Sequence, residues 1–413
     1  MATIIGPVQK CQVCGSTRLS PVLDLGHHPI VQNYLDAKAL QAPETTYPLR
    51  LTRCDDCALV QLDYVVDPAA VFPPSYPYRT GLTNMLLRNF EALAEEMLAN
   101  NFFSKGNLVV DIGSNDGSLL QSFKKRGAHV VGVEPTDAAK VANKVGIKTY
   151  QEFFDIASAA RLAKRHGKAR VVTATNVFAH IPDTPKLLRA VKSLLASDGV
   201  FVSESQYLGD IVEKLEFDTI YHEHLRFYSL RPLLRLAKDA GMSIVDAHRI
   251  SAAGGSIRVY MKKGAHEASA RTRKLMQQEE ASHLNEKETI ETFAHDVVRT
   301  KNDLLTLLLS IRKKGANIVA ISSPARSNTL LNFCHLTPDI IEYAGEKKGS
   351  PKIGLFAPGS HIPVVDELRI FKEQSTYALV LSWHIGEELM KIYRKLGYKG
   401  AFIMPLPTPR ILK

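Results

Sequence analysis

Residues 107–120 read Asn-Leu-Val-Val-Asp-Ile-Gly-Ser-Asn-Asp-Gly-Ser-Leu-Leu, and this stretch decides the fold. An apolar run typical of a buried strand leads into a turn with Gly113 and Gly117, and the turn opens a helix capped by Asn, Asp or Ser. Glycine lets the backbone approach a ligand closely, and the N-terminus of a helix offers free N–H groups. The stretch therefore predicts a strand, a ligand-binding turn and a helix of a doubly wound α/β sheet.

A second apolar strand, at residues 130–133, ends in an acid, Glu134. It lies about 20 residues beyond the first glycine, where an acid bonds the ribose hydroxyls in dinucleotide-binding sheets. The strand, turn, helix and acid together predict a site for an adenosine-containing cofactor. The alternative is a turn of the same shape that binds no ligand.

The alternation of strands and helices continues through the middle of the chain. We expect strands at residues 170–174, 200–204, 242–247 and 256–262, and helices at 85–100, 185–195 and 230–240. Residues 196–199 are expected to form the C-terminal turn of the second helix. This pattern is that of a doubly wound, Rossmann-like domain, which we place at residues 71–264.

A second α/β unit follows a charged, helical spacer that begins at about residue 265. We expect strands at residues 316–321, 377–382 and 400–404, and helices at 330–334 and 387–396. The first strand runs into a turn rich in Ser and Asn that includes Arg326, which makes a plausible anion site; the alternative for Arg326 is a surface ion pair. The spacer and this second, Rossmann-like lobe fill residues 265–413.

Four of the five cysteines form two Cys-x2-Cys pairs, Cys11/Cys14 and Cys54/Cys57. Two such knuckles supply four thiolates, and tetrahedral zinc needs four ligands. Because four thiolates leave no open position, the ion would be structural, within a small N-terminal zinc-binding module at residues 1–70. Disulfides or redox pairs are the alternative, although a cytoplasmic chain disfavours disulfides. Cys334 stands alone after an apolar run and is expected to be a core residue.

Residues 221–224 are Tyr221-His222-Glu223-His224, three titratable side chains and a phenol in consecutive positions. Neighbours this polar are not expected in a packed core, because each would need its own buried partner. On an extended backbone the two histidines would point to one side of the chain. The cluster could abstract a proton, hold a metal ion or form a hydrogen-bonded loop. Since the cysteines account for the metal, we favour the catalytic interpretation.

The composition is that of a globular protein, with 45% hydrophobic and 23% charged residues among 413. We find no apolar run of about 18 residues that would cross a membrane. The net charge of +10 suits an anionic partner. The first residues lack the basic start and apolar region of a secretory signal. We therefore expect a cytoplasmic protein, acting as a monomer without a membrane partner.

Taken together, the motifs resemble the sugar-nucleotide C-methyltransferases, S-adenosylmethionine-dependent enzymes that build branched deoxysugars. The resemblance covers the whole chain in order. Besides the cysteine pairs and residues 111–117 and 221–224, it rests on Tyr76-Pro77-Tyr78, Asn176-Val177-Phe178-Ala179-His180-Ile181, Ala325-Arg326-Ser327-Asn328-Thr329 and Pro358-Gly359-Ser360-His361-Ile362-Pro363.

The resemblance implies methyl transfer from S-adenosylmethionine to C3 of a 4-keto-deoxysugar carried by dTDP or GDP. The catalytic residues it implies are His224, as the base that removes the C3 proton, with Glu223, Tyr221, His180 and Tyr76. The cofactor contacts it implies are Tyr78, Asp111, Gly113, Asn115, Gly117, Glu134 and Asn176. The substrate contacts it implies are His222, Arg326, Asn328, Thr329 and His361.

The C-terminal lobe is implied to close over the nucleotide diphosphate. Many relatives carry a Gly-Ala-Ser type of turn there, whereas this chain has Ser322-Ser323-Pro324-Ala325. We therefore expect this loop to sit differently on the pyrophosphate.

The chemistry explains why these residue types are needed. A ketone makes the adjacent C–H acidic, a histidine that titrates near neutrality suits its removal, and a phenol or a second histidine can stabilise the enolate oxygen. Glu223 could orient an imidazole. Methylation of a sugar oxygen or nitrogen, which needs no acidic C–H, is the nearest alternative. An RNA methyltransferase would cluster basic residues among aromatics, whereas here they are scattered, so we expect no nucleic-acid partner. A non-enzymatic scaffold would not bind the cofactor.

Overall fold

The computed structural model describes residues 5–82 and 84–413 and divides into two compact units, each built from several chain segments. Unit 1 comprises Met1–Ser20, Thr52–Gly209 and Leu225–Lys287. Unit 2 comprises Pro21–Leu51, Asp210–His224 and Glu288–Lys413. We describe each unit by itself. The three-part division of the chain at residues 70 and 264 remains a prediction.

The centre of unit 1 is a seven-stranded sheet with the order β12-β13-β10-β9-β6-β7-β8. Its strands are β6 (Leu108–Ile112), β7 (His129–Val133), β8 (Thr149–Tyr150), β9 (Ala169–Thr175), β10 (Leu195–Gln206), β12 (Met242–Ile250) and β13 (Ser256–Lys263). The five strands from β10 to β8 are parallel, and β13 pairs antiparallel with both β10 and β12. The strand order reverses at β6, where doubly wound sheets bind their ligands.

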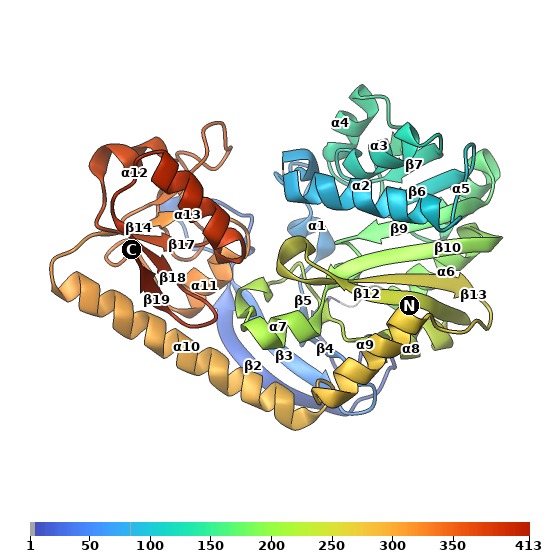
Figure 1. Cartoon of the computed structure of the whole chain (residues 1–413), viewed down its shortest axis with the longest axis horizontal. Helices are drawn as coiled ribbons and strands as arrows, with labels where there is room; N and C mark the ends of the chain where they lie inside the picture. The colour runs from blue at the N-terminus through green and yellow to red at the C-terminus, as the bar shows by residue number, and fades with distance from the viewer. Residues whose placement is uncertain (1–4, 83) are drawn as a thin grey trace. The chain divides into compact units, whose positions relative to one another are not determined.

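The helices of unit 1 connect these strands; the sequence predicted those at residues 85–100, 185–195 and 230–240, but not the two that lie between residues 138 and 166. The connecting helices are α2 (Asn84–Ala99), α3 (Ser118–Lys125), α4 (Ala138–Lys144), α5 (Ile156–His166), α6 (Thr184–Leu194), α8 (Leu230–Asp239) and α9 (Ala270–Ala281). The predicted strand, turn and helix at residues 107–120 are confirmed as β6, a turn and α3. Figure 1 shows α2 lying along the sheet.

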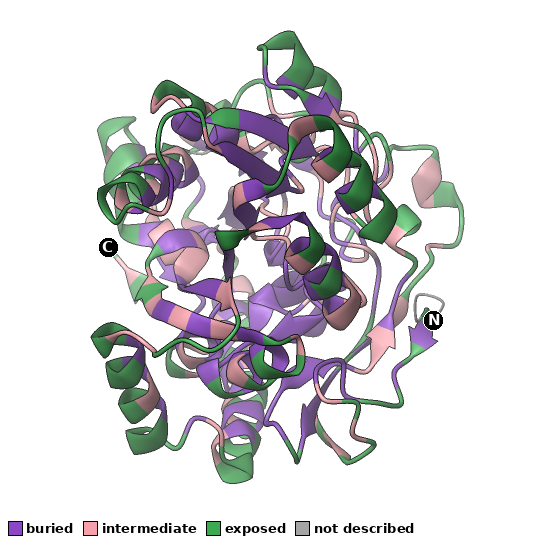
Figure 2. Ribbon diagram, turned by 90° about the vertical axis from the view of Figure 1, so that its right-hand side faces the viewer, coloured by how far each residue is buried: buried purple, intermediate pink, exposed green. Residues whose placement is uncertain are grey.

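The apolar spacing of α2 explains its place on the sheet. Leu86, Phe90, Leu93 and Met97 recur at helical intervals and are buried. They share one hydrophobic core with side chains of α3 and of the strands β6, β7, β9 and β10. Figure 2 shows that the strands are largely buried, whereas the helices that cover them are buried on one face and exposed on the other.

Unit 2 is built on a six-stranded sheet with the order β16-β15-β14-β17-β18-β19. Its strands are β14 (Ile318–Ile321), β15 (Ala344–Glu346), β16 (Val364–Asp366), β17 (Tyr377–Val380), β18 (Ala401–Met404) and β19 (Arg410–Leu412). All neighbours are parallel except β18 and β19. Its helices are α11 (Ser327–Phe333), α12 (Leu368–Glu373) and α13 (Gly386–Lys395). The predicted second Rossmann-like lobe is confirmed.

The N-terminal part of the chain forms smaller sheets. β1 (Gly6–Pro7) pairs with β5 (Tyr64–Val65), and a four-stranded sheet has the order β11-β4-β3-β2. The strands of the second sheet are β2 (Leu19–His28), β3 (Tyr47–Cys54), β4 (Val60–Leu62) and β11 (Arg226–Phe227). The remaining helices are the short α1 (Pro68–Val71), α7 (Leu208–Lys214) and the long α10 (Lys287–Lys313), with which the predicted helical spacer ends.

Two sequence-based boundaries were wrong. Residues 196–199 are part of β10 rather than a turn, because Leu195 already pairs with Ala169 before the strand shifts its register and pairs again from Val200. The predicted helix at residues 330–334 begins earlier, at Ser327, because polar residues in its first turn are buried and helical. Within the described part of the chain, none of the helices combines the length and the apolar character needed to cross a bilayer.

Candidate active site

The four cysteines of the two knuckles lie together in unit 1. Cys11 Sγ is 3.5 Å from Cys57 Sγ, and Cys14 Sγ is 3.6 Å from Cys54 Sγ. All four sulfur atoms lie within 4.8 Å of one another. A hydrogen bond with Cys57 lowers the pKa of Cys11 to about 5, whereas the same bond raises the pKa of Cys57 and burial raises that of Cys14 to about 11.

This arrangement fits one zinc ion. Tetrahedral zinc with Zn–S bonds of about 2.3 Å holds its sulfur ligands about 3.8 Å apart. The knuckles shape themselves locally, since the backbone N–H of Gly15 donates to the carbonyl of Cys11 and that of Ala58 donates to the carbonyl of Cys54. When bound, zinc holds the two knuckles together, and four sulfur ligands leave it no position for a substrate.

The turn after β6 is shaped by Gly113. Its φ is +69°, and a Cβ added there would lie 2.5 Å from the side chain of Val177. Only glycine meets both demands, the left-handed backbone and the close approach. The turn therefore carries a left-handed backbone packed closely against the Val177 side chain, which a larger residue at position 113 would displace.

The acid at the end of β7 is held against that turn. Glu134 accepts hydrogen bonds from the backbone N–H groups of Asn115 at 3.0 Å and Thr136 at 2.8 Å. Asp111 is buried and accepts from the Thr173 hydroxyl at 2.7 Å. Burial, with the nearby Glu134 carboxylate in support, raises the pKa of Asp111 to about 7.

Tyr78 and Asn176 lie at the same edge of unit 1. The Asn115 side chain donates to the Tyr78 carbonyl at 3.3 Å. Asn176 follows β9 with a φ of +55°, and its Oδ1 is buried with no hydrogen-bond partner in the part of the chain that the structure describes. A buried acceptor of this kind beside a glycine turn fits the polar cofactor, S-adenosylmethionine, that these residues were predicted to hold.

Tyr76 and His180 are brought together through a third ring. Phe72 makes an edge contact with Tyr76, at a centroid distance of 5.3 Å, and stacks on His180 at 5.8 Å. His180 lies beyond β9 in the connection to α6, on the same side of the sheet edge as Asn176. The sequence placed Tyr76 and His180 in one group, and the structure gives them a shared neighbour.

Residues 221–224 form a turn rather than an extended segment, so the predicted alternation of side chains was wrong. The backbone N–H of His224 donates to the carbonyl of Tyr221 at 2.9 Å. This turn brings the rings of Tyr221 and His224 together, with a centroid distance of 4.0 Å. The expectation that such polar residues avoid the core was also wrong, because His222, Glu223 and His224 are each at most 4% exposed.

His224 is oriented by a backbone carbonyl. Its Nδ1 lies 2.7 Å from the carbonyl oxygen of Thr219. A neutral imidazole that donates from Nδ1 carries its acceptor lone pair on Nε2. Burial lowers the pKa of His224 to about 4, although the bond to Thr219 opposes this shift and the charge of Arg326 supports it. The ring is therefore neutral at physiological pH, and its pKa lies below the near-neutral value that the sequence suggested for the base.

His222 is held in a different way. Its Nε2 lies 3.1 Å from the carbonyl oxygen of Pro48, and its ring makes an edge contact with Tyr47. Burial lowers the pKa of His222 to about 4. Backbone carbonyls thus help to orient both imidazoles.

Arg326 is buried and fully engaged with acids of unit 2. Its guanidinium donates twice to Asp218, at 2.8 and 2.7 Å, and once to Glu216 at 3.0 Å. Trp383 Nε1 donates to the same Asp218 carboxylate at 2.8 Å. Sequence reasoning missed these two acids and the tryptophan, because no local motif marks them.

The other predicted substrate contacts also lie in unit 2. Thr329 Oγ1 donates to the carbonyl of Ile220 at 2.8 Å, and His361 Nε2 lies 3.1 Å from a Glu44 oxygen. Asn328 Nδ2 donates to the Val31 carbonyl at 2.7 Å. Asn328 Oδ1 is buried with no hydrogen-bond partner among the described residues, so it remains available to a ligand.

Glu346 is a further residue that the sequence did not reveal. It ends β15, and its Oε1 accepts from the backbone N–H of Ser323, in the turn after β14, at 2.6 Å. This is the contact that Glu134 makes in unit 1. The rule that found Glu134 could have found Glu346, had the short strand β15, which reads Ala-Gly-Glu, been apolar enough to recognise.

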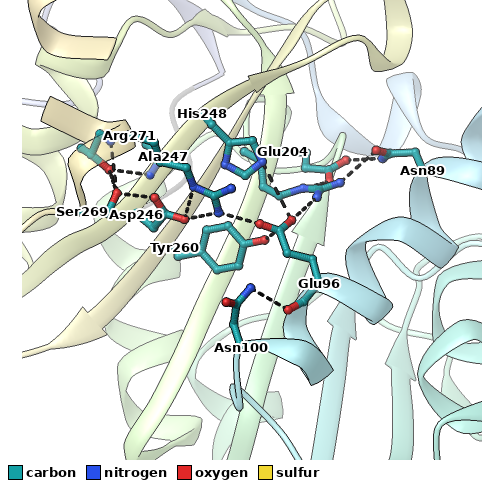
Figure 3. A network of polar contacts seen from close by, with 12 residues as sticks. Asn89, Glu96, Asn100, Glu204, Asp246, Ala247, His248, Tyr260, Ser269 and Arg271 are labelled. Carbon is teal, nitrogen blue, oxygen red and sulfur yellow. Dashed lines mark hydrogen bonds and ion pairs between the residues drawn. The ribbon is translucent and has the colours of Figure 1, made fainter. Parts of the chain in front are cut away.

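A second group of possible metal ligands in unit 1 is an ion-pair network. Glu96, Asp246 and His248 bring ligand atoms within 4.8 Å of one another. Figure 3 shows Arg271 between the two acids, and it donates to Glu96 at 2.5 Å and to Asp246 at 2.6 Å. Arg258 donates to Glu96 at 2.7 Å as well. The two guanidiniums satisfy the carboxylates, so the network ties α2 to β12, β13 and α9.

A pocket of about 660 Å³ lies at the opposite edge of the seven-stranded sheet, where the parallel strands begin. His129, Lys168 and Arg170 are among the residues that line it. The residues predicted for the cofactor follow the carboxyl ends of the strands, where doubly wound sheets bind ligands. The pocket is therefore not part of the predicted active site.

Comparison with known proteins covers the chain in three parts and as a whole. Family models match as a zinc binding domain at residues 11–72, a methyltransferase domain at 85–247 and a C-methyltransferase C-terminal domain at 251–407. The C-methyltransferase NovU of Streptomyces niveus is 31% identical over 416 residues, which cover 100% of this chain and 99% of that protein.

Other relatives match the central part alone. The ubiquinone biosynthesis O-methyltransferase of Cupriavidus pinatubonensis is 30% identical over 156 residues, 34% of this chain and 62% of that protein. The solved structure of magnesium protoporphyrin IX methyltransferase (ChlM) from Synechocystis PCC 6803 with bound SAM covers 44% of this chain and 80% of its own, at 16% identity and a TM-score of 0.34.

Proposed function

Because this chain belongs to the C-methyltransferase family and is an S-adenosylmethionine-dependent enzyme with a zinc-binding module, we propose that it methylates C3 of a nucleotide-linked 4-keto-deoxysugar. His224 acts as the base. The observation that carries the proposal is the geometry of this buried imidazole, whose Nδ1 is held by the Thr219 carbonyl at 2.7 Å.

The base must be neutral and must present Nε2 to the substrate. Burial keeps His224 uncharged above a pH of about 4, and the bond to Thr219 selects the tautomer. A proton on C3 of a 4-keto sugar is acidic because the electron pair that remains spreads onto the ketone oxygen. Transfer of this proton to Nε2 leaves an enolate with nucleophilic character at C3.

The enolate oxygen needs a donor beside the base. Tyr221 is a candidate in unit 2, since its ring centroid lies 4.0 Å from that of His224. A phenol can donate to a developing negative charge without carrying a charge itself. Glu223, His180 and Tyr76 complete the proposed catalytic group.

Bound S-adenosylmethionine supplies an electrophilic methyl group to the carbon nucleophile. In unit 1 the turn at Gly113, the carboxylate of Glu134 and the buried acceptor of Asn176 would hold the cofactor. Tyr78, Asp111, Asn115 and Gly117 complete this set.

The nucleotide part of the substrate is assigned to the carboxyl edge of the unit 2 sheet. β14 is flanked by β15 and β17 at the point where the strand order reverses, which is where such sheets bind nucleotides. Glu346 offers an acid at the ribose position, and Asn328 Oδ1 offers a buried acceptor. Thr329, His361 and His222 lie in the same unit.

A test combines labelled cofactor with candidate sugars. The protein is incubated with S-adenosylmethionine carrying a ¹³C methyl group and with dTDP- and GDP-linked 4-keto-deoxysugars, and NMR identifies the atom that receives the methyl group. We expect the label on carbon. Label on oxygen or nitrogen with every sugar would contradict the proposal.

The base is tested with His224→Gln and a matched control, His295→Gln, which changes an exposed histidine of α10 in the same unit. Loss of a general base costs about 10²- to 10⁴-fold in rate. We expect a loss of roughly 1,000-fold in kcat for His224→Gln, with cofactor affinity near normal, and no loss for the control. A variant with substantial residual rate would remove His224 from this role.

A further inference from the structure

Arg326 and its two acids form a buried charge cluster in unit 2. Asp218 is 0% exposed, Glu216 is 1% exposed and Arg326 is 8% exposed. Two parallel bonds join the guanidinium to Asp218, and a third bond reaches Glu216. Bidentate pairs of this kind fix direction as well as distance.

The cluster is poorly suited to hold a phosphate. A phosphate that approached Arg326 would meet two carboxylates that already share its charge. The Asp218 carboxylate is also held by Trp383 Nε1, and the Trp383 ring lies 5.2 Å from the guanidinium carbon. These contacts hold Arg326 in the interior of unit 2 and direct it towards residues 216–218.

The segment that Arg326 holds leads directly to the base. Asp218 is followed by Thr219, whose carbonyl accepts from His224 Nδ1, and then by Ile220, whose carbonyl accepts from Thr329 Oγ1 at 2.8 Å. Arg326 and Thr329 belong to the beginning of α11. The carbonyl of Thr219 is thus fixed from both sides by one helix.

We propose that Arg326 is a positioning residue for the base: by fixing Asp218 it fixes the Thr219 carbonyl, and through this carbonyl it sets the orientation and tautomer of His224. The inference rests on the proposed function, because it takes His224 as the base. It also replaces the phosphate contact that the sequence predicted for Arg326.

The charge of Arg326 acts on His224 as well. It adds to the effect of burial, which lowers the pKa of His224 to about 4. The Thr219 carbonyl, the Tyr221 ring and the charge of Arg326 act on the base. The cluster itself contains Arg326, Asp218 and Glu216, with Lys214 and His384 nearby. Arg326 could therefore act on His224 through its hydrogen-bond geometry or through its charge. A variant that keeps the positive charge but loses the geometry separates these two roles.

Arg326→Lys is that variant. Lysine keeps a positive charge but cannot donate two parallel bonds to Asp218. A displacement of the base of about 1 Å costs as much as 100-fold in rate. We expect kcat to fall by roughly 10- to 100-fold, with the KM for the sugar nucleotide within about threefold of the wild-type value. Asp218→Asn, which keeps the size of the side chain, should change kcat in the same direction by a smaller factor.

The matched control is Arg312→Gln. It removes a half-buried arginine of unit 2 that pairs with Glu342 at 3.0 Å. We expect no change in kcat or KM. A rise of more than about tenfold in the KM of Arg326→Lys at unchanged kcat would identify a phosphate ligand and overturn the proposal. Unchanged kcat in both Arg326→Lys and Asp218→Asn would overturn it too.

A second readout needs no turnover. NMR of the full chain with ¹⁵N-labelled histidine reports the tautomer of His224, whose signal is assigned by its absence from His224→Gln. We expect the Nδ1–H tautomer in the wild type and a mixture in Arg326→Lys and Asp218→Asn; an unchanged tautomer would contradict the proposal. Because this measurement does not depend on methyl transfer, a failure of the proposed function is distinguishable from a failure of the positioning role.

Discussion

The two parallel sheets of this chain have the same order around their first strand, yet they use the turn after that strand differently. In unit 1, β6 is followed by Gly113, where a side chain would collide with Val177. In unit 2, β14 is followed by Ser322, with a φ of +64°, and the turn contains no glycine. The Val177 side chain packs against the first turn, whereas Lys352 and Tyr34 bond to Ser323 in the second.

Both sheets keep the acid that faces the turn. Glu134 accepts two backbone N–H groups and Glu346 accepts one. Besides the turns themselves, the two units differ in the side chains that follow the turn, where Arg326 of unit 2 is directed at Asp218. One strand order is thus proposed to hold a ligand in unit 1 and, in unit 2, also to support the segment that carries the proposed base.

Loss of zinc should give the largest difference between the two units, because the cysteine cluster lies in unit 1. Cys54→Ser removes a ligand of the cluster in unit 1, and structural zinc contributes on the order of 10 kcal/mol in zinc-finger peptides. We expect elemental analysis to find about one zinc ion per wild-type chain and almost none in this variant. The matched control is Cys334→Ser in unit 2, which should retain the metal. A folded wild-type protein without zinc would refute the metal assignment.

The second largest difference between the units should be their loss of stability at acid pH. In unit 2, burial lowers the pKa of His28, His222 and His224 to about 4 and that of His384 to about 3. A lowered pKa gives stability that is present above the unfolded value of about 6.5 and is lost as the pH falls towards 4. Together these four histidines lower the free energy of unfolding by on the order of several kcal/mol between pH 6.5 and pH 4.

In unit 1 burial also lowers the pKa of the half-buried His248 to about 4, while the pKa of Asp111 is raised to about 7 and contributes in the opposite sense. Hydrogen exchange followed by mass spectrometry, corrected for the intrinsic rate at each pH, should show peptides of unit 2 losing protection first between pH 6.5 and pH 4. Earlier loss in unit 1 would contradict this prediction.

The glycine turn of unit 1 should be sensitive to a single side chain. Gly113→Val places two methyl groups where Val177 already lies and strains a backbone with a φ of +69°. We expect a loss of about 100-fold or more in affinity for S-adenosylmethionine by calorimetry. Gly167→Val is the control, because Gly167 has a φ of +86° but nothing within 4 Å of its added Cβ. Equal losses in both variants would show that strain alone is responsible.

The two acids should give the smallest and most specific effects. Glu134→Gln and Glu346→Gln each remove a charge-assisted bond, worth about tenfold in binding. We expect the first to weaken S-adenosylmethionine and the second to raise the KM of the nucleotide sugar. The comparison of the two sheets fails if each variant affects the other ligand.

The sequence revealed the main elements of both sheets because their strands are apolar and are bounded by clear turns. The cysteine knuckles and the Gly113 turn could be predicted since their chemistry is local. The burial of His222 and His224 could not, because the carbonyls of Pro48 and Thr219 that satisfy them carry no side-chain signature. Nor could the pairing of Arg326 with Asp218, which joins residues 108 positions apart.

The measurement that tests the account most directly is exchange of the sugar C3 proton with solvent. The wild-type protein is incubated in D₂O with a nucleotide-linked 4-keto-deoxysugar and with S-adenosylhomocysteine in place of the methyl donor, so that the enolate can only be reprotonated. We predict that deuterium enters C3 with the wild type and not with His224→Gln. Carbon methylation by the wild type without such exchange, or equal exchange in the variant, would contradict His224 as the base.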